Sequence, residues 1–221
     1  MNASDEGRHE PGGPGWLERW TFEAWEKEAP FGAIAAITLD PAAHHAWYWA
    51  TVVRAGHPLL TLVDTELHLP KSSLALRGPA LWADHVCETP LEHWTVANEA
   101  YGVALSDPDE ALGAQRGEVV AIGFDLEWES ADDPVELLDG YTIDATVNGE
   151  ILIADETLAI EAAGRWRHQW GELRWPTLPA PAPRGTRAPL RIDRAAGDPI
   201  LVERVLAPDG WHEWLRPERA P

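Results

Sequence analysis

The alternation of apolar and polar residues along the chain is typical of β-strands. In the segment 118–129, EVVAIGFDLEWE, one face is apolar and the other becomes increasingly acidic; the apolar face is formed by Val120, Ile122, Phe124, Leu126 and Trp128. A period of two residues indicates a strand with one face in the core. The segments 58–69, 74–105 and 141–162 follow the same period over much of their length and are also predicted to be strands.

Two segments near the start of the chain are apolar almost throughout. They are 31–39, FGAIAAITL, which ends at Asp40 and Pro41, and 46–55, AWYWATVVRA, which ends before Gly56. Their β-rich composition and their flanking turn residues predict a hairpin. The preceding segment 16–28, WLERWTFEAWEKE, fits the helix period and the strand period about equally, so its type stays open.

Turn and capping residues divide the rest of the chain. The segment 106–115, SDPDEALGAQ, has an N-cap residue, an early proline and acidic residues, which predict one short helix. Asn148-Gly149 predicts a hairpin turn within 141–154, and Asp209-Gly210 predicts the turn of a last hairpin at 200–215. Roughly eleven or twelve short strands at such intervals are typical of an all-β barrel or sandwich.

The 221 residues suit a single domain of the all-β kind. We expect a disordered leader at 1–15, the main β-barrel at 16–175, a proline-rich linker at 176–189 and a C-terminal strand or hairpin extension at 190–221. The leader has neither a basic start nor an apolar core, so it is not predicted to be a secretion signal.

Composition and charge exclude several classes of partner. The chain is 45% apolar and 24% charged, with no run near the roughly 18 apolar residues of a membrane helix. A formal charge of −20 repels phosphate groups, so neither nucleic acid nor a membrane surface is expected as a partner. The single cysteine, Cys87, cannot form an internal disulfide, which favours a cytoplasmic location.

Tryptophan is unusually frequent, with 13 Trp against 3 Phe and 3 Tyr. Large rigid aromatic side chains spread over strands are typical of a barrel interior or a ligand cavity, although they also simply fill β cores. Both interpretations remain open. Candidate ligand-binding residues are the aromatic and polar side chains of the predicted cavity: Arg77, Trp82, Trp94, Asn98, Tyr101, Trp128, Trp166 and Trp170.

The candidate chemistry is acid–base chemistry. His168 lies between Trp166 and Trp170 on one strand face, and a desolvated imidazole or carboxylate is suited to protonating an alkene or enol. The candidate catalytic residues are His168, Glu88, Asp84 and His85. The structural alternatives are that His168 only packs and donates one hydrogen bond, and that Arg77, Asp84 and Glu88 form a buried ion-pair cluster.

No metal or other cofactor is expected from the sequence. His85, Cys87 and His93 are metal-ligand types, but their spacing matches no metal-binding motif, and Pro90 prevents a helix that would bring Glu88 and Glu92 together. The sequence also lacks a Gly-x-Ser-x-Gly nucleophile turn and a glycine-rich phosphate loop.

Four segments carry a resemblance to a known family: LWADHVCETPLEHW at 81–94, EAYGVAL at 99–105, GFDLEWE at 123–129 and RHQWGELRW at 167–175. They resemble the lipocalin-like family of hydroxyneurosporene synthases, which are carotenoid hydratases, together with AttH-type proteins and some natural-product Diels-Alderases. The resemblance implies two lipocalin-type barrels in tandem, an apolar ligand held in or between them, and no metal or redox cofactor. Two departures are Arg174, where the family pattern has an acid before its final Trp, and the presence of residues for only one barrel.

We therefore expect an antiparallel lipocalin-like barrel with one short helix. Its expected function is to bind an apolar small molecule (a polyketide, terpenoid or steroid-like compound), with cofactor-free hydratase, cyclase or isomerase chemistry as one outcome. A non-catalytic carrier or accessory subunit and a Trp-rich protein-interaction module are the alternatives. A homodimer is expected if two single barrels replace the tandem arrangement.

Overall fold

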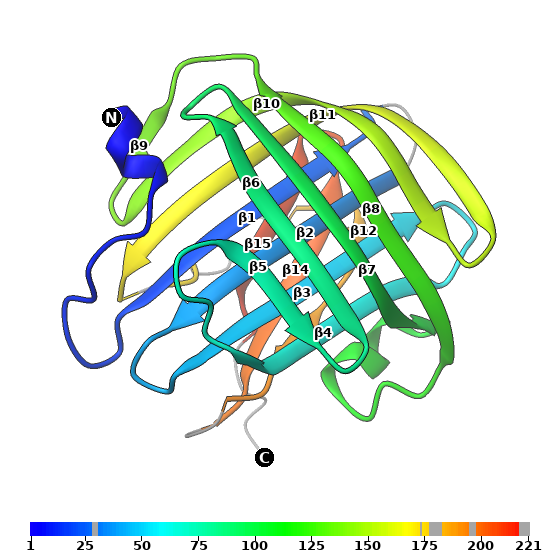
Figure 1. Ribbon diagram of the computed structural model, residues 1–221. Coiled ribbons are helices and arrows are strands. Elements are labelled where there is room, and N and C mark those ends of the chain that lie inside the picture. Colours follow the sequence, from blue (N-terminus) through cyan, green and yellow to red (C-terminus); the bar gives the residue numbers. More distant parts are fainter. Residues whose placement is uncertain (28–30, 173, 177–182, 195–197, 217–221) are drawn as a thin grey trace.

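The computed structural model describes residues 1–221 except 28–30, 173, 177–182, 195–197 and 217–221. Strands make up 65% of it and helical residues 4%, which confirms the predicted all-β class. Eight strands form a closed antiparallel ring in the order β4-β3-β2-β1-β11-β10-β8-β7, and β7 pairs back to β4 (Figure 1). Their bounds are β1 Leu17–Trp25, β2 Phe31–Asp40, β3 His45–Arg54, β4 Leu59–His68, β7 His93–Leu105, β8 Glu118–Ser130, β10 Gly140–Ile153 and β11 Glu156–Gly171.

Three shorter strands extend this ring. The hairpin of β5 (Leu74–Gly78) and β6 (Leu81–Thr89) pairs with the first part of β7, whereas β4 pairs with the end of β7. The strand β9 (Val135–Leu137) pairs with the start of β10. The barrel strands therefore span Leu17–Gly171, where the sequence predicted a barrel at 16–175 and left the type of 16–28 open.

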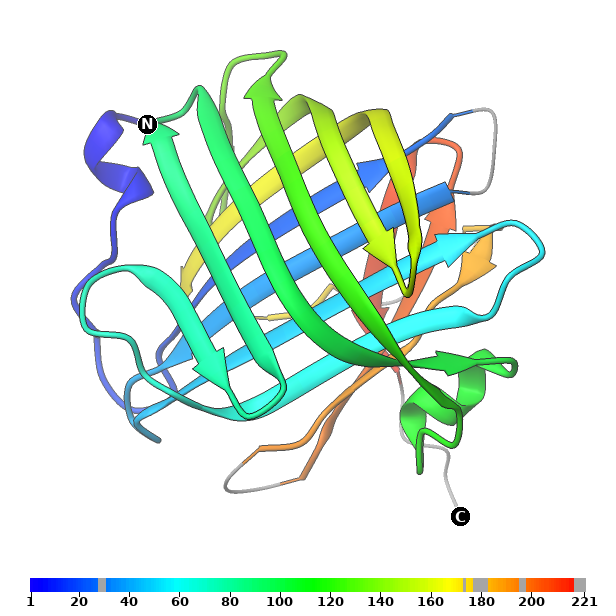
Figure 2. The ribbon, with the colours of Figure 1, turned by 45° about the vertical axis from the view of Figure 1, so that its right-hand side comes forward.

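A second sheet covers part of the outside of the barrel. It contains β12 (Thr186–Arg187), β13 (Leu190–Ile192), β14 (Ile200–Ala207) and β15 (Gly210–Leu215), and it includes the hairpin predicted at 200–215. Figure 2 shows it behind β1, β2 and β3. Leu206 and Trp211 pack on Trp25 and Ile34, while Val202 lies in a cluster with Trp47 and two neighbours, Ala36 and Trp49.

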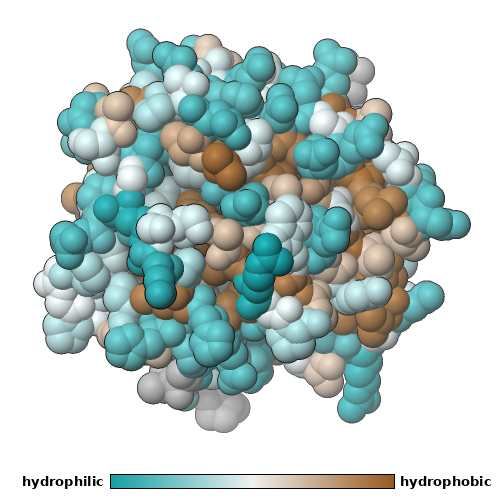
Figure 3. Space-filling view, in the orientation of Figure 1, coloured by the Kyte–Doolittle hydropathy of each residue, from teal (hydrophilic) through white to brown (hydrophobic). Residues whose placement is uncertain are grey.

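This cover explains the two continuous apolar segments. In β2 and β3 one set of alternate residues faces the barrel interior, and the other set faces the C-terminal sheet. Both faces are dry, so both select apolar side chains. On the opposite side, over β5 to β8, the surface mixes hydrophilic and hydrophobic residues (Figure 3), as expected where one face of a sheet meets water.

The predicted turn at Asn148-Gly149 is wrong. β10 runs through both residues while pairing with β8 and β11, and the chain reverses at Ala154-Asp155, with Ala154 at φ 55°. Gly149 has φ 132°, and a Cβ there would lie 2.1 Å from the carbonyl oxygen of Asp125. The glycine therefore permits close approach of β8 rather than a turn.

The predicted short helix at 106–115 is the 3₁₀ helix η2, Pro108–Leu112, capped by the side chain of Asp107. A second 3₁₀ helix within the described residues, η1 (Ala3–Glu6), lies in the segment predicted to be a disordered leader. Within the predicted linker at 176–189, residues 177–182 lie outside the described part of the chain. No helix among the described residues has the length and apolar character needed to cross a membrane.

The ordered contacts of residues 2–9 correct the disordered-leader prediction. Glu6 is buried; one carboxylate oxygen accepts a hydrogen bond from the backbone N–H of Leu91 at 3.0 Å, and the other accepts one from Trp94 Nε1 at 3.2 Å. Arg8 donates to the carbonyl of Pro70 at 2.7 Å. The segment therefore lies across one end of the barrel (Figures 1 and 2), held by buried polar contacts that its composition does not reveal.

Candidate functional site

A cluster of ionisable side chains occupies the end of the barrel beneath the N-terminal segment. Glu18 comes from β1, His168 from β11, and His9 from the segment that follows η1. Trp20 and Tyr141 are the direct register partners of His168 on the two neighbouring strands. Because directly paired residues share a face, His168 lies on the inner face between two aromatic residues.

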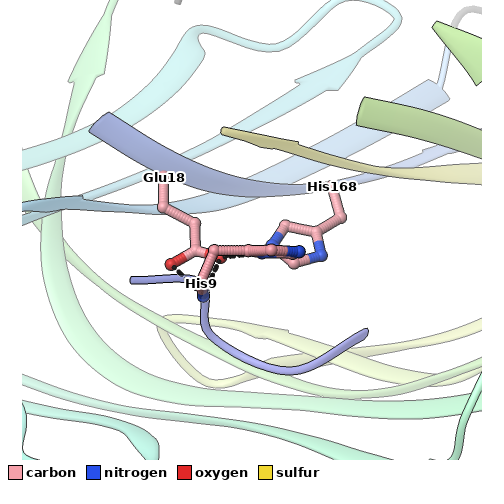
Figure 4. A group of neighbouring side chains, drawn as sticks. All are labelled: His9, Glu18 and His168. Carbon is pink, nitrogen blue, oxygen red and sulfur yellow. Dashed lines mark hydrogen bonds and ion pairs between the residues drawn. The ribbon is translucent and has the colours of Figure 1, made fainter. Parts of the chain in front are cut away.

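The Glu18 carboxylate is the centre of the cluster (Figure 4). Its Oε1 atom lies 2.9 Å from His168 Nε2, 2.8 Å from His9 Nδ1 and 3.0 Å from the backbone nitrogen of His9. On its other side, His168 Nδ1 lies 2.9 Å from the carbonyl oxygen of Asp5. Glu18 and His168 are essentially inaccessible to solvent, whereas the His9 side chain is 25% exposed.

Aromatic rings fix both imidazoles. Trp20 stacks on His168 with a centroid distance of 4.2 Å, and Trp170 stacks on His9 at 3.9 Å. Trp170 also meets His168 edge-on at 4.9 Å. Burial lowers the pKa of His168, while the hydrogen bond and the charge of Glu18 act in the opposite direction.

The same three residues could hold a metal ion. One ligand atom from each of His9, Glu18 and His168 lies within 4.8 Å of the other two. Two imidazole nitrogens and a carboxylate oxygen form a ligand set that zinc and other divalent transition metals use. The sequence interpretation, which expected no metal, did not include His9 or Glu18.

A second polar group lies inside the barrel on other strands. His85 of β6 meets Phe22 at 5.2 Å and Tyr48 of β3 at 5.9 Å between ring centroids, and Asn98 lies on the adjacent strand β7. His85, Asn98 and Tyr48 are at most 3% exposed. Among the described residues, their hydrogen-bonding side-chain atoms have no partner.

The structure separates the predicted site residues into two groups. Six of them are buried on the inner face of the barrel and Trp170 packs beside them; the six are His168, His85, Asn98, Trp94, Trp128 and Trp166. The other five lie on outward-facing positions and do not line the interior: Asp84, Glu88, Arg77, Trp82 and Tyr101. Successive residues of a strand face opposite ways, so Asp84 and His85 could not both point inward.

The alternative of a buried ion-pair cluster of Arg77, Asp84 and Glu88 is also not observed, since Arg77 and Glu88 are exposed. A buried ionic network instead joins the outer face of β1 and β11 to the C-terminal sheet. Glu213 lies 3.6 Å from Arg19 and 3.4 Å from Arg167, and Arg167 also pairs with Glu23. Burial opposes ionisation of Glu213, yet Arg167, Arg19 and Arg204 together hold its pKa below the ordinary value.

Sequence reasoning missed Glu18, His9 and Tyr48. Glu18 shares an inner face with Trp20 and Phe22, a signal that could be used only once 16–28 was assigned as a strand. His9 carries no periodic signal, because it lies in an irregular segment.

Two hollows among the described residues lie away from the predicted site residues. One of about 800 Å³ is lined by Trp25, Lys27, Asp144, Glu161 and neighbouring residues, and another of about 740 Å³ lies between residues 89–93 and 129–134. None of the predicted site residues lines either one. On the inner face of the barrel, the predicted aromatic residues Trp94 and Trp128 lie within 5.4 Å of Phe22 between ring centroids.

These features define a closed antiparallel β-barrel protein with a His–Glu–His cluster at one end, in which Glu18 and His168 are buried. The chain belongs to the family described as Domain of unknown function (DUF7064), whose model matches residues 2–182. The matched range includes His9, Glu18 and His168 and ends before β12. No curated protein and no solved structure matches the chain.

Proposed function

We propose that this protein binds an apolar small molecule inside its barrel and recognises one neutral polar group of that molecule. The observation that carries the proposal is the group of His85, Asn98 and Tyr48, whose buried polar atoms have no partner in the described part of the chain. A buried polar atom without a partner costs about 1–3 kcal/mol. A ligand group that supplies the missing hydrogen bonds would recover this cost.

The chemistry of the three side chains selects the polar group. Burial lowers the pKa of His85 to about 3, so its imidazole is neutral and offers one donor and one acceptor. The Asn98 amide and the Tyr48 hydroxyl are also neutral, and each both donates and accepts. Such a set matches a hydroxyl or a carbonyl group, whereas a carboxylate or an ammonium ion would be buried without a counter-charge.

The remainder of the inner face favours an apolar molecule. Phe22, Trp94 and Trp128 supply aromatic surface near His85, while the facing strands β2 and β3 present small side chains, among them Ala33, Ala35 and Ala50. Terpenoid, polyketide and steroid-like alcohols or ketones combine an apolar body with few polar groups. These compound classes are therefore the proposed ligands.

The resemblance to hydroxyneurosporene synthases belongs to the same proposal, because that family acts on apolar polyenes. A cytoplasmic location is also proposed, resting on the single cysteine. The proposed function is ligand binding. It applies both to a carrier, which releases the ligand unchanged, and to an enzyme, which releases it converted.

The test compares farnesol with farnesene, two compounds with the same carbon skeleton of which only farnesol carries a hydroxyl group. Quenching of tryptophan emission should report saturable binding of both, with farnesol the tighter. Tyr48→Phe removes only a hydroxyl from the proposed site, so it should weaken farnesol binding roughly three- to tenfold and leave farnesene unchanged.

Tyr101→Phe is the matched control, since Tyr101 is 60% exposed on the outer face of β7. It should leave the affinity for both compounds unchanged. Failure of farnesol to bind saturably, or equal effects of the two Tyr→Phe variants, would count against the proposal.

A further inference from the structure

We propose that His9, Glu18 and His168 form a binding site for one divalent first-row transition metal ion, with Zn²⁺ as the expected ion. The site goes beyond the proposed ligand-binding function, because it uses other residues and needs no organic ligand. The argument rests on hydrogen-bond geometry, on the convergence of three ligand atoms, and on how the side chains are held.

The hydrogen-bonding pattern of His168 leaves the contact between its Nε2 atom and Glu18 without a shared proton, and a cation could bridge the two atoms. Nδ1 faces the carbonyl oxygen of Asp5 at 2.9 Å, and a carbonyl only accepts, so Nδ1 carries a proton. A neutral imidazole then has a lone pair on Nε2, yet Nε2 faces Glu18 Oε1 at 2.9 Å, which also offers lone pairs. A metal ion bound to both atoms removes this conflict.

The contact between His168 and Asp5 is also the usual outer contact of a metal-bound histidine. Such a histidine binds metal through one ring nitrogen and donates the other N–H to a backbone carbonyl or a carboxylate. Here Asp5 provides the carbonyl, and the Trp20 and Trp170 rings restrict rotation of His168. The ligand is thus oriented before any metal binds.

The three ligand atoms already converge. Figure 4 shows both imidazoles directed at the Glu18 carboxylate, with His9 Nδ1 at 2.8 Å from Oε1. Zinc bonds of about 2.0–2.2 Å in tetrahedral geometry place ligand atoms about 3.3 Å apart. The two contacts of Glu18 Oε1 would therefore widen by about 0.4–0.5 Å, and the two imidazole nitrogens already lie within 4.8 Å of each other. His9 lies outside the barrel strands, in the segment that follows η1.

A metal at this site would have three protein ligands and an open fourth position, as in catalytic zinc sites. It would also fasten the N-terminal segment, because His9 is the ligand that this segment contributes. Metal binding should therefore stabilise the folded chain and protect residues 2–9 from proteolysis.

The experiment titrates the chelator-treated full-length protein with ZnCl₂ by calorimetry and with CoCl₂ by absorption spectroscopy. The wild type should bind one Zn²⁺ per chain, and Co²⁺ should give the intense visible bands of a four- or five-coordinate site. His9→Ala should weaken Zn²⁺ binding at least tenfold, and Glu18→Gln should weaken it further. Zn²⁺ should raise the melting temperature of the wild type but not that of Glu18→Gln.

His93→Ala is the matched control, because His93 also faces a carboxylate, Glu127, at 3.8 Å but lies outside the cluster. It should leave Zn²⁺ affinity unchanged. His9 is partly exposed, so His9→Ala should fold even if Glu18→Gln does not, which circular dichroism would show.

Absence of one-to-one Zn²⁺ binding by the wild type, or equal affinities of wild type and His9→Ala, would overturn the proposal. In that case His168 would carry a second proton, on Nε2, and would donate it to Glu18 in a hydrogen bond. Farnesol binding through His85, Asn98 and Tyr48 would not be affected by this outcome, so the two proposals fail separately.

Discussion

The two sides of the barrel differ in what lies outside them. Nine of the ten residues of β2 are buried, because the C-terminal sheet covers its outer face. In β8, on the other side, only four of thirteen are buried, and these are the inward-facing alternate residues. The same barrel therefore contains strands that follow two different sequence rules, and the second layer determines which rule applies.

The first prediction, with the largest expected effect, compares an aspartate introduced under the C-terminal sheet with one introduced on the uncovered side of the barrel. Ala36 of β2 is fully buried with Trp47 and Val202, so Ala36→Asp should cost about 4 kcal/mol or more, or prevent folding. Ala121→Asp, on the outer face of β8, should cost about 1 kcal/mol or less. Chemical unfolding followed by circular dichroism measures both, and equal losses would refute the comparison.

The second prediction removes a tryptophan from each side. Trp211 is buried between the sheets and donates from Nε1 to the carbonyl of Ala24 at 3.1 Å. Trp211→Ala should lower the free energy of unfolding by about 3–5 kcal/mol. Trp82→Ala, at a half-buried outward position of β6, should cost about 1 kcal/mol. A small loss in both variants would show that the C-terminal sheet contributes little.

The third prediction concerns the buried ionic network. Glu213→Gln leaves Arg19 and Arg167 without their shared carboxylate, and we expect a loss of about 2–3 kcal/mol. Glu127, which is 54% exposed on β8, is the control. Glu127→Gln should change stability by less than about 0.5 kcal/mol. Urea unfolding at pH 7 checks both values, and an unchanged Glu213→Gln would mean that the network does not hold the two sheets together.

The fourth and smallest effect has the opposite sign. In the ligand-free protein, Tyr48→Phe on β3 removes a buried hydroxyl that has no partner among the described residues, so it should stabilise the fold by about 1 kcal/mol. Tyr101→Phe on β7 should be neutral. Destabilisation by Tyr48→Phe would indicate that this hydroxyl already has a hydrogen-bond partner.

The comparison of the two sides also explains which strands the sequence predicted well. The alternation of 118–129 follows from one dry and one wet face, so β8 was predicted directly from its residues. In β1 that rule fails, because Glu18 faces the interior cluster while Arg19 and Glu23 lie beneath the C-terminal sheet. Charged residues on both faces remove the period, and the strand could not be told from a helix.

The candidate site was predictable only in part. His168 was identified because Trp166 and Trp170 lie on the same face, yet its partner Glu18 lies 150 positions away. No local pattern links two residues that far apart. For 81–89 the spacing allowed two opposite orientations, and the interior takes Ala83 and His85 rather than Asp84 and Glu88. The Asn148-Gly149 signal failed for a similar reason, because a pair that suits a turn also permits the close approach of β8.

The pairing of β1 with β11 also constrains how the chain can fold. Arg19 and Gln169 come together across 150 positions, so the ring cannot close until nearly the whole barrel sequence is available. Contacts of such long range make folding slow. During synthesis, β1 and β2 leave the ribosome long before β11 and the C-terminal sheet, with the apolar residues of both faces still uncovered. This topology therefore requires protection from aggregation during that interval. The segment that needs it most is FGAIAAITL.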